Sequence, residues 1–233
     1  MKRVLVIAVD GTAASGKGTL ARRLARHFGF AYLDTGALYR QTAVGVLRAG
    51  GDPANEKDAL DAAMTIDPLR VDAAALRDAQ VAQAASVVAA IPSVRQALLA
   101  FQRRFAADPP GGARGAVIDG RDIGTVVCPQ ADAKLFVDAS VEVRAHRRWL
   151  EFRQAGDLIP EATVVADIRK RDARDRGRAV APLKPAPDAR LLDTSDLDID
   201  AAFAAALGLV EPGIGEALRV TATGVEGDPA VRR

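Results

Sequence analysis

The most constraining feature of the sequence is a glycine-rich loop near the N-terminus. Residues 11–19 read GTAASGKGT and follow the apolar run VLVIAV (residues 4–9) and Asp10. A strand, a glycine-rich turn with inward-facing N–H groups, a lysine and a following helix together bind phosphate. All four are expected here, because TLARRLARHF after the loop has helical periodicity. The segment therefore predicts a site for nucleotide phosphates, in which Lys17 reaches the outer ones.

Four further apolar runs resemble the one before this loop, and Asp follows each of the five. Uninterrupted apolar runs are typical of strands buried on both faces, and helical stretches between them favour parallel crossovers. We therefore predict a doubly wound α/β fold with a five-stranded parallel sheet, whose ligands bind beyond the carboxyl ends of the strands. The runs are residues 4–9, 30–33, 115–118, 133–137 and 189–192, followed by Asp10, Asp34, Asp119, Asp138 and Asp193.

Two connections between the predicted strands are far longer than a simple crossover requires. The first is Ala-rich and helical in pattern, and we interpret residues 36–105 as a substrate-binding insert. The second, residues 147–185, contains the charged run RKRDARDRGR and is interpreted as an arginine-rich lid. Taken alone, such a run is more often a solvated helix crossed by Arg/Asp pairs. We expect one domain over residues 1–210 and a flexible, Gly- and Pro-punctuated tail over residues 211–233.

The composition excludes several other classes of protein. Hydrophobic residues make up 49% of the chain and the net charge is only +2, so neither nucleic acid nor a membrane is expected as a partner. A single cysteine, Cys128, excludes an internal disulfide framework and a cysteine-based zinc site. The only histidines are His27 and His146, and we interpret His146 as structural. Together these features indicate a cytoplasmic protein.

Further motifs follow the predicted strands in a fixed order. They are DTGALYR (34–40), DGRDIGTVVCP (119–129), RAHRRWL (144–150) and RDARDRGRAVAPL (171–183). The phosphate loop ends in G-K-G-T, where Gly18 stands at the position of the usual hydroxyl residue and Thr19 follows it. Together with this ending, the motifs resemble the bacterial cytidylate kinases. The resemblance covers about residues 4–207. It implies a monomeric nucleoside monophosphate kinase that moves the γ-phosphate of ATP onto CMP or dCMP with Mg²⁺.

The resemblance also implies roles for individual residues. Lys17, Arg121 and Arg178 would be catalytic, and Asp119 would hold Mg²⁺ through water. ATP would bind the loop residues Gly11, Thr12, Ala13, Ala14, Ser15, Gly16, Lys17, Gly18 and Thr19. CMP would contact Thr35, Arg40, Ser86, Arg95, Arg121, Asp122, Arg171, Asp175 and Arg178.

The chemistry supports an arginine-rich site independently, since phosphoryl transfer depends on positioning and charge neutralisation more than on a general base. Arg171, Arg174 and Arg178 are spaced to share one helical face. We also expect Arg147 and Arg148 to belong to the lid. One departure from the family is that residues 64–80 offer at most one strand, where the family often has a small antiparallel sheet.

Three alternatives stay open at this point. A GTP-hydrolysing switch would need an N-K-x-D motif, which the sequence lacks. A kinase for UMP or another small monophosphate is the nearer alternative, and Asp122 is the residue that discriminates it. A non-catalytic nucleotide- or RNA-binding protein would not require Lys17.

Overall fold

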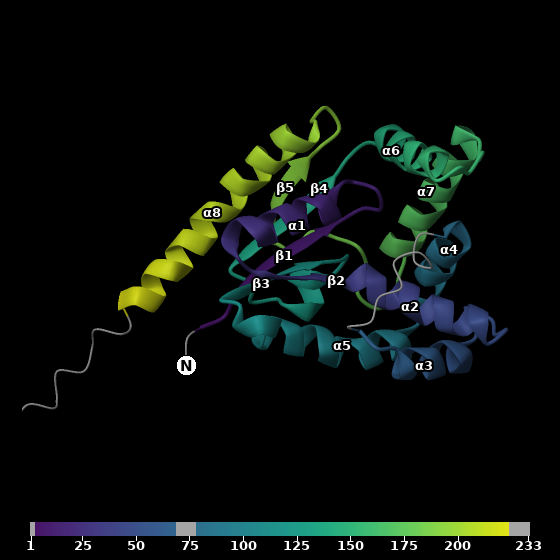
Figure 1. Ribbon diagram of the computed structural model, residues 1–233, viewed down its shortest axis with the longest axis horizontal. Coiled ribbons are helices and arrows are strands. Elements are labelled where there is room, and N and C mark those ends of the chain that lie inside the picture. The colour runs from purple at the N-terminus through teal and green to yellow at the C-terminus, as the bar shows by residue number, and fades with distance from the viewer. Residues whose placement is uncertain (1–2, 69–77, 224–233) are drawn as a thin grey trace, which may run out of the picture.

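The five apolar runs form one parallel sheet in the computed structural model, which describes residues 3–68 and 78–223. The order along the sheet is β2-β3-β1-β4-β5, which confirms the predicted α/β fold (Figure 1). The central strand β1 has β3 on one side and β4 on the other, so the connections diverge at its carboxyl end, where ligands bind in such folds. The strands are β1 (Leu5–Gly11), β2 (Ala31–Asp34), β3 (Gly115–Asp119), β4 (Ala133–Asp138) and β5 (Arg190–Asp193).

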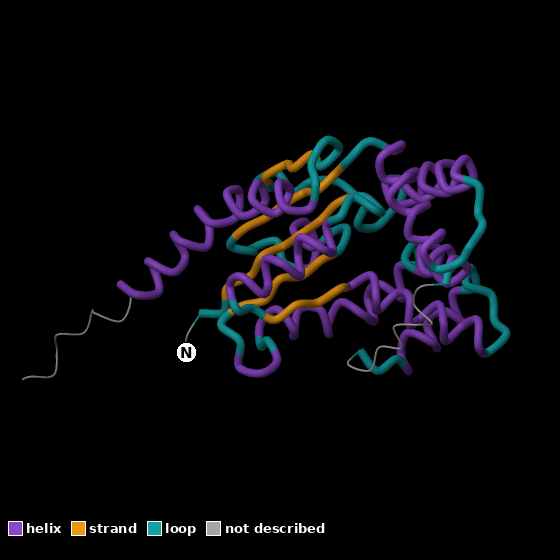
Figure 2. Tube along the Cα trace, turned by 45° about the horizontal axis from the view of Figure 1, so that its top comes forward, coloured by secondary structure: helices purple, strands orange, loops and turns teal. Residues whose placement is uncertain are grey.

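Helices cover both faces of this sheet (Figures 1 and 2). Side chains along β1 alternate, because successive residues of a strand point to opposite faces. Ile7 and Val9 pack in one cluster with α1 (Lys17–Phe28) and α8 (Ile199–Thr223). Ala8 packs in another cluster with the end of α5 (Pro92–Ala107). The sheet is thus enclosed on both faces, while the carboxyl ends of its strands are left for the site.

The first long connection forms a helical unit with a core of its own. Leu38, Val46, Val88 and Leu98 are buried in this core. The one strand that the sequence allows here falls on residues 64–80, of which 69–77 lie outside the described part of the chain. The helices are α2 (Thr35–Arg48), α3 (Glu56–Thr65), α4 (Ala79–Val88) and α5, followed by a short 3₁₀ turn η2 (Pro110–Gly112).

The second long connection forms two packed helices, α6 (Val141–Gln154) and α7 (Glu161–Arg176). Their contact buries Ala145, Val164 and Ile168. Figure 1 shows this pair beyond the sheet, on the same side as α2 and α4. Both long connections therefore lie where the strands end.

The C-terminal helix corrects one prediction. A tail was expected from residue 211, but α8 continues to Thr223 and extends past the sheet (Figure 2). Ile214 is 1% exposed and packs on the main core, as does Ala217. Gly213 allows this close packing, since a Cβ there would lie 2.5 Å from the Asp132 carbonyl oxygen. The prediction is wrong for residues 211–223 because helix packing outweighs the local effect of Pro212, and residues 224–233 lie outside the described part.

Candidate active site

The phosphate loop turns tightly between β1 and α1. Gly11 has φ of 150°, and a Cβ there would lie 1.9 Å from the Val137 carbonyl oxygen, so only glycine fits. Ala14 and Gly16 also have positive φ, at 60° and 83°. Helix α1 begins at Lys17, and its N-terminus adds positive potential at the loop. The backbone therefore has the form expected of an anion-binding turn.

Lys17 is buried at the start of α1 and lies between the loop and β3. Its Nζ donates a hydrogen bond to the Thr12 carbonyl oxygen over 3.4 Å and lies 3.8 Å from Asp119 Oδ1. Burial and the charge of Arg121 lower the pKa of Lys17 to about 8, although Asp119 acts in the opposite direction. An anionic phosphate beside Lys17 would offset this cost of burying its charge.

Gly18, the departure from the common loop pattern, has a packing reason. A Cβ at this position would lie 3.0 Å from Asp119 Oδ2, so a side chain here would crowd that carboxylate. Tyr32 donates a hydrogen bond from its hydroxyl to the same oxygen over 3.3 Å. Thr19, the neighbouring hydroxyl, is exposed on the first turn of α1. Glycine after the lysine thus keeps the Asp119 carboxylate close to the phosphate loop.

All the predicted CMP-binding residues line one cavity of about 120 Å³, although they come from five different parts of the chain. The cavity also contains Lys17 and Asp119, which brings the predicted acceptor site to the phosphate loop. The predicted residues in it are Thr35, Arg40, Ser86, Arg95, Arg121, Asp122, Arg171, Asp175 and Arg178.

Asp122 and Arg95 are paired with each other at one end of this cavity. Arg95 donates a hydrogen bond to Asp122 Oδ2, and also one to the Ala89 carbonyl oxygen over 3.2 Å. The Arg95 guanidinium lies 5.6 Å from the ring centre of Tyr39, which supports it from α2. The pair leaves Asp122 Oδ1 as an acceptor beside guanidinium N–H donors. Such an arrangement of donors and acceptors is complementary to the edge of a cytosine ring.

Asp10 holds the loop that carries Asp122. Its two carboxylate oxygens accept hydrogen bonds from the backbone N–H groups of Ile123 and Gly124, each over 2.7 Å. These residues begin the single π-helical turn η3 (Ile123–Val127) directly after Asp122. Burial raises the pKa of Asp10 to about 7 despite these two hydrogen bonds. The end of β1 therefore fixes the position of the loop that carries Asp122 as well as that of the phosphate loop.

Arginines dominate the other end of the cavity, and Asp175 connects two of them. Asp175 accepts hydrogen bonds from Arg121 over 3.1 Å and from Arg178. Burial disfavours the Asp175 carboxylate, but Arg121, Arg178 and Arg171 together lower its pKa below the usual value. Burial and the nearby charge of Arg121 lower the pKa of Arg171 to about 9. Because positive charges outnumber negative charges at this end of the cavity, we expect an anionic ligand to bind there.

Several buried polar atoms in this cavity have no protein hydrogen-bond partner among the described residues. They are Ser86 Oγ, Arg171 Nε and Arg178 Nε. Buried polar atoms in folded proteins are nearly always hydrogen-bonded. The atoms left unpaired here thus belong to residues predicted to bind the acceptor nucleotide.

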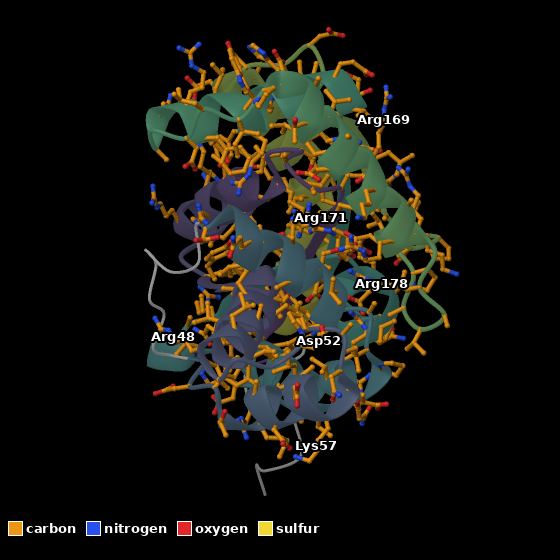
Figure 3. The ribbon with its side chains drawn as sticks, turned by 90° about the vertical axis from the view of Figure 1, so that its right-hand side faces the viewer. Arg48, Asp52, Lys57, Arg169, Arg171 and Arg178 are labelled. Atoms are coloured by element: carbon orange, nitrogen blue, oxygen red, sulfur yellow. The ribbon has the colours of Figure 1, made fainter. Side chains whose placement is uncertain are left out.

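A larger cavity of about 800 Å³ opens from this site between α4 and the α6–α7 pair. Arg171 lines both cavities and lies between the helices in Figure 3. Arg148 also lines the larger one. Arg147 points elsewhere, because it donates hydrogen bonds to Thr194 Oγ1 over 3.0 Å and to the Thr194 carbonyl oxygen over 2.7 Å. The two neighbouring arginines, both expected in the lid, therefore have different surroundings.

Some residues of the site were not identified from the sequence. Asp34 caps α2 and accepts a hydrogen bond from Arg40 over 2.7 Å, so it orients an arginine of the site. Tyr39 lies beneath Arg95. Both belong to the motif DTGALYR, which was the available signal.

Comparison with known proteins decides the family. Residues 7–211 match the family model for cytidylate kinase. The chain belongs to the cytidylate kinase family. A cytidylate kinase of Paramagnetospirillum magneticum is 62% identical over 88% of this chain and 97% of its own. One from Nitrobacter winogradskyi is 57% identical over 89% of this chain and 96% of its own.

Three of the motifs quoted from the sequence, DTGALYR, DGRDIGTVVCP and RDARDRGRAVAPL, contribute residues to the smaller cavity. No single helix among the described residues is long and apolar enough to cross a membrane. One bent pair, Gln80–Val88 with Pro92–Gly112, meets the criteria of length and composition jointly, with 94° between its two parts. The described residues also contain no cluster of three or more His, Cys, Asp or Glu side chains placed to hold a metal ion.

Proposed function

We propose that the protein transfers the γ-phosphate of ATP to CMP or dCMP and releases ADP with CDP or dCDP. The observation that carries this proposal is the buried Arg95–Asp122 pair in a cavity that also reaches Lys17. The pair supplies hydrogen-bond donors and an acceptor for a base, and Lys17 marks the phosphate loop. One cavity therefore reaches from the residues proposed to bind the base to the lysine of the phosphate loop.

The transfer step requires neutralisation of charge on the moving phosphoryl group. Lys17 would contact the outer phosphates of ATP, and Arg121 and Arg178 would contact the phosphate of the acceptor. Asp175 keeps these two arginines in place by binding both. Electrostatic stabilisation of this kind is the main contribution that proteins make to phosphoryl transfer.

Mg²⁺ is proposed as the metal that accompanies ATP. Asp119 fits this role because its buried carboxylate lies beside Lys17 and Gly18. Mg²⁺ usually keeps several waters and binds one or two carboxylates together with substrate phosphates, so a larger protein cage is not required. When bound, the ion would neutralise charge on the phosphate oxygens. Thr19, exposed on α1, is available to an inner phosphate or its bound water.

A single chain is proposed to be sufficient for this activity, because the two cavities already contain the lysine of the phosphate loop and all the residues predicted to bind the acceptor. ATP and CMP are intracellular nucleotides, so we place the protein in the cytoplasm.

Closure of the cleft is proposed as part of the reaction, because a kinase must keep water from accepting the phosphoryl group. The moving parts would be the insert (residues 36–105) and the lid (residues 147–185), which border the larger cavity from two sides. Hydrogen exchange in both segments should slow when ATP and CMP bind together. Protection confined to residues 11–19 would contradict this two-lid closure.

The direct test of the function is a coupled assay of ADP release with ATP, Mg²⁺ and each nucleoside monophosphate in turn. CMP and dCMP should be the preferred acceptors. A preference for UMP or another monophosphate would favour the alternative kinase. Salt-dependent RNA affinity that persists in Lys17→Ala, without turnover of any monophosphate, would favour a nucleic-acid-binding protein.

A further inference from the structure

Arg144, on the first turn of α6, is the largest fully buried side chain among the described residues, with 1% of its surface exposed. Its Nε donates a hydrogen bond to the Ala139 carbonyl oxygen over 2.8 Å, in the connection between β4 and α6. It lines neither of the two cavities described above. A buried guanidinium is costly unless it is paired and hydrogen-bonded, so its partners indicate what it does.

The first partner is the lid helix α7. Arg144 Nη1 and Nη2 donate to Asp172 Oδ1 and Oδ2 over 3.1 and 2.6 Å, a bidentate ion pair with a fixed geometry. Asp172 is 3% exposed and lies next to Arg171 in sequence. Neighbouring residues on an α-helix point about 100° apart. The ion pair therefore sets the rotation of α7, and with it the direction in which Arg171 enters the cavities.

The second partner is the phosphate loop. Arg144 Nη1 also donates to the Ala13 carbonyl oxygen over 3.2 Å. The C=O and N–H of a trans peptide point in opposite directions, so this bond directs the Ala14 N–H away from Arg144. Ala14 has φ of 60°, a conformation unusual for a residue other than glycine, and it lines the larger cavity. The bond thus helps to hold a strained peptide of the loop in one orientation.

We propose that Arg144 is a positioning residue that links the phosphate loop to helix α7 at Asp172, the point about which the lid would close, so that Lys17 and Arg171 face the same phosphoryl group. The inference deepens the proposed kinase function and rests on it. One guanidinium contacts both the donor side, through Ala13, and the acceptor side, through Asp172. Its loss should consequently affect ATP and CMP together.

The same two helices offer a matched control. Arg169 on α7 forms an ion pair with Glu142 on α6 over 3.2 Å, and both side chains are mostly exposed. Figure 3 shows Arg169 at the outer rim of the molecule, whereas Arg171 lies between the helices. An exposed pair of this kind contributes little to stability. Arg169→Met therefore removes an ion pair between α6 and α7 without touching the phosphate loop.

The test replaces the buried pair with apolar residues in the double variant Arg144→Met, Asp172→Leu. Such replacements often preserve stability, since no buried charge is left unpaired. Thermal unfolding would establish that the variant is folded, and calorimetry would measure the affinities for ATP and CMP separately. Asp172→Asn, which keeps the size of the side chain, is the second variant should the double variant not fold. ATP affinity is read directly, so this test does not depend on which monophosphate is the acceptor.

We expect kcat to fall about ten-fold to a hundred-fold, since small misplacements of reacting groups have effects of this size. The affinity for ATP should weaken together with that for CMP, while Arg169→Met should match the wild-type protein. A folded double variant with normal kcat and ATP affinity would overturn the proposal and leave the pair a purely structural role. Should the double variant not fold, a folded Asp172→Asn with normal kcat and ATP affinity would overturn it equally. Failure of the wild-type protein to phosphorylate CMP would instead contradict the proposed function.

Discussion

Base selection by Asp122 gives the sharpest test of the proposed acceptor site, and Asp122→Asn is the informative change. Asp122 is 5% exposed and Arg95 is 8% exposed, so neither side chain can turn freely into water. An ionised carboxylate only accepts hydrogen bonds, which suits the amino group of cytosine and would face the carbonyl oxygen of uracil. The wild-type protein should therefore prefer CMP over UMP by roughly 2 to 4 kcal/mol, or roughly thirty-fold to a thousand-fold in kcat/KM.

The Asn side chain keeps the shape of Asp122 and adds a donor for uracil. Replacement of a charge-assisted hydrogen bond to cytosine by a neutral one should weaken transition-state stabilisation with CMP by up to about 1.5 to 3 kcal/mol. This loss corresponds to a decrease of roughly ten-fold to 150-fold in kcat/KM. The ratio of kcat/KM for CMP to kcat/KM for UMP should decrease mainly because of this loss. Arg95 keeps its hydrogen bond to Ala89 and its contact with Tyr39, so it should stay in place.

The assay is the coupled measurement of ADP release with each monophosphate at saturating ATP. Asp188→Asn is the matched control, because Asp188 is also paired with a cation, Lys134, but lies outside both cavities. That variant should keep the wild-type ratio. If Asp122→Asn leaves the ratio of CMP to UMP unchanged while CMP turnover persists, then Asp122 does not select the base and the assigned acceptor site is wrong.

Three further predictions concern catalysis, acid stability and the C-terminal helix. Lys17→Ala should lower kcat by orders of magnitude in a folded protein, since the outer phosphates lose their cation; near-normal turnover would remove the phosphate loop from the mechanism. The net lowering of the Asp175 pKa by Arg121 and its neighbours means that this carboxylate stabilises the fold above about pH 4. That contribution is lost as the pH falls through the lower folded-state pKa, so Asp175→Asn should show a smaller loss of stability on acidification in denaturant titrations. Ile214→Ala should cost about 2 to 5 kcal/mol of unfolding free energy, whereas a loss below about 1 kcal/mol would indicate that this part of α8 does not pack on the core.

Much of the fold was predictable because its signals are local. An uninterrupted apolar run followed by Asp indicates a buried strand and its end, and each of the five runs became a strand. The loop GTAASGKGT needs glycines at set positions for its backbone, so it is recognisable from a few residues. The order of the motifs was then sufficient to identify the family and to select residues that the fold gathers in one cavity.

The remaining features depend on contacts between residues far apart in the sequence. A tail was predicted from residue 211, but the chain there is helical because Ile214 and Ala217 pack on the main core. Local helix propensity does not reveal such packing. Arg144 and Asp172 lie in two of the motifs quoted from the sequence, but only the packing of the helices shows that they form a buried ion pair and that Arg144 also binds the Ala13 carbonyl oxygen.

The sequence by itself determined the strands, the phosphate loop and the chemical types of residue available for transfer, since these follow from apolar patterning and backbone geometry over a few residues. Only the tertiary structure decided that Arg95 is bound to Asp122 and that Asp10 holds the loop that carries Asp122. The physical reason is burial. A charged side chain removed from water must be paired or hydrogen-bonded, and which groups lie within reach is set by the packing of the strands and helices around it.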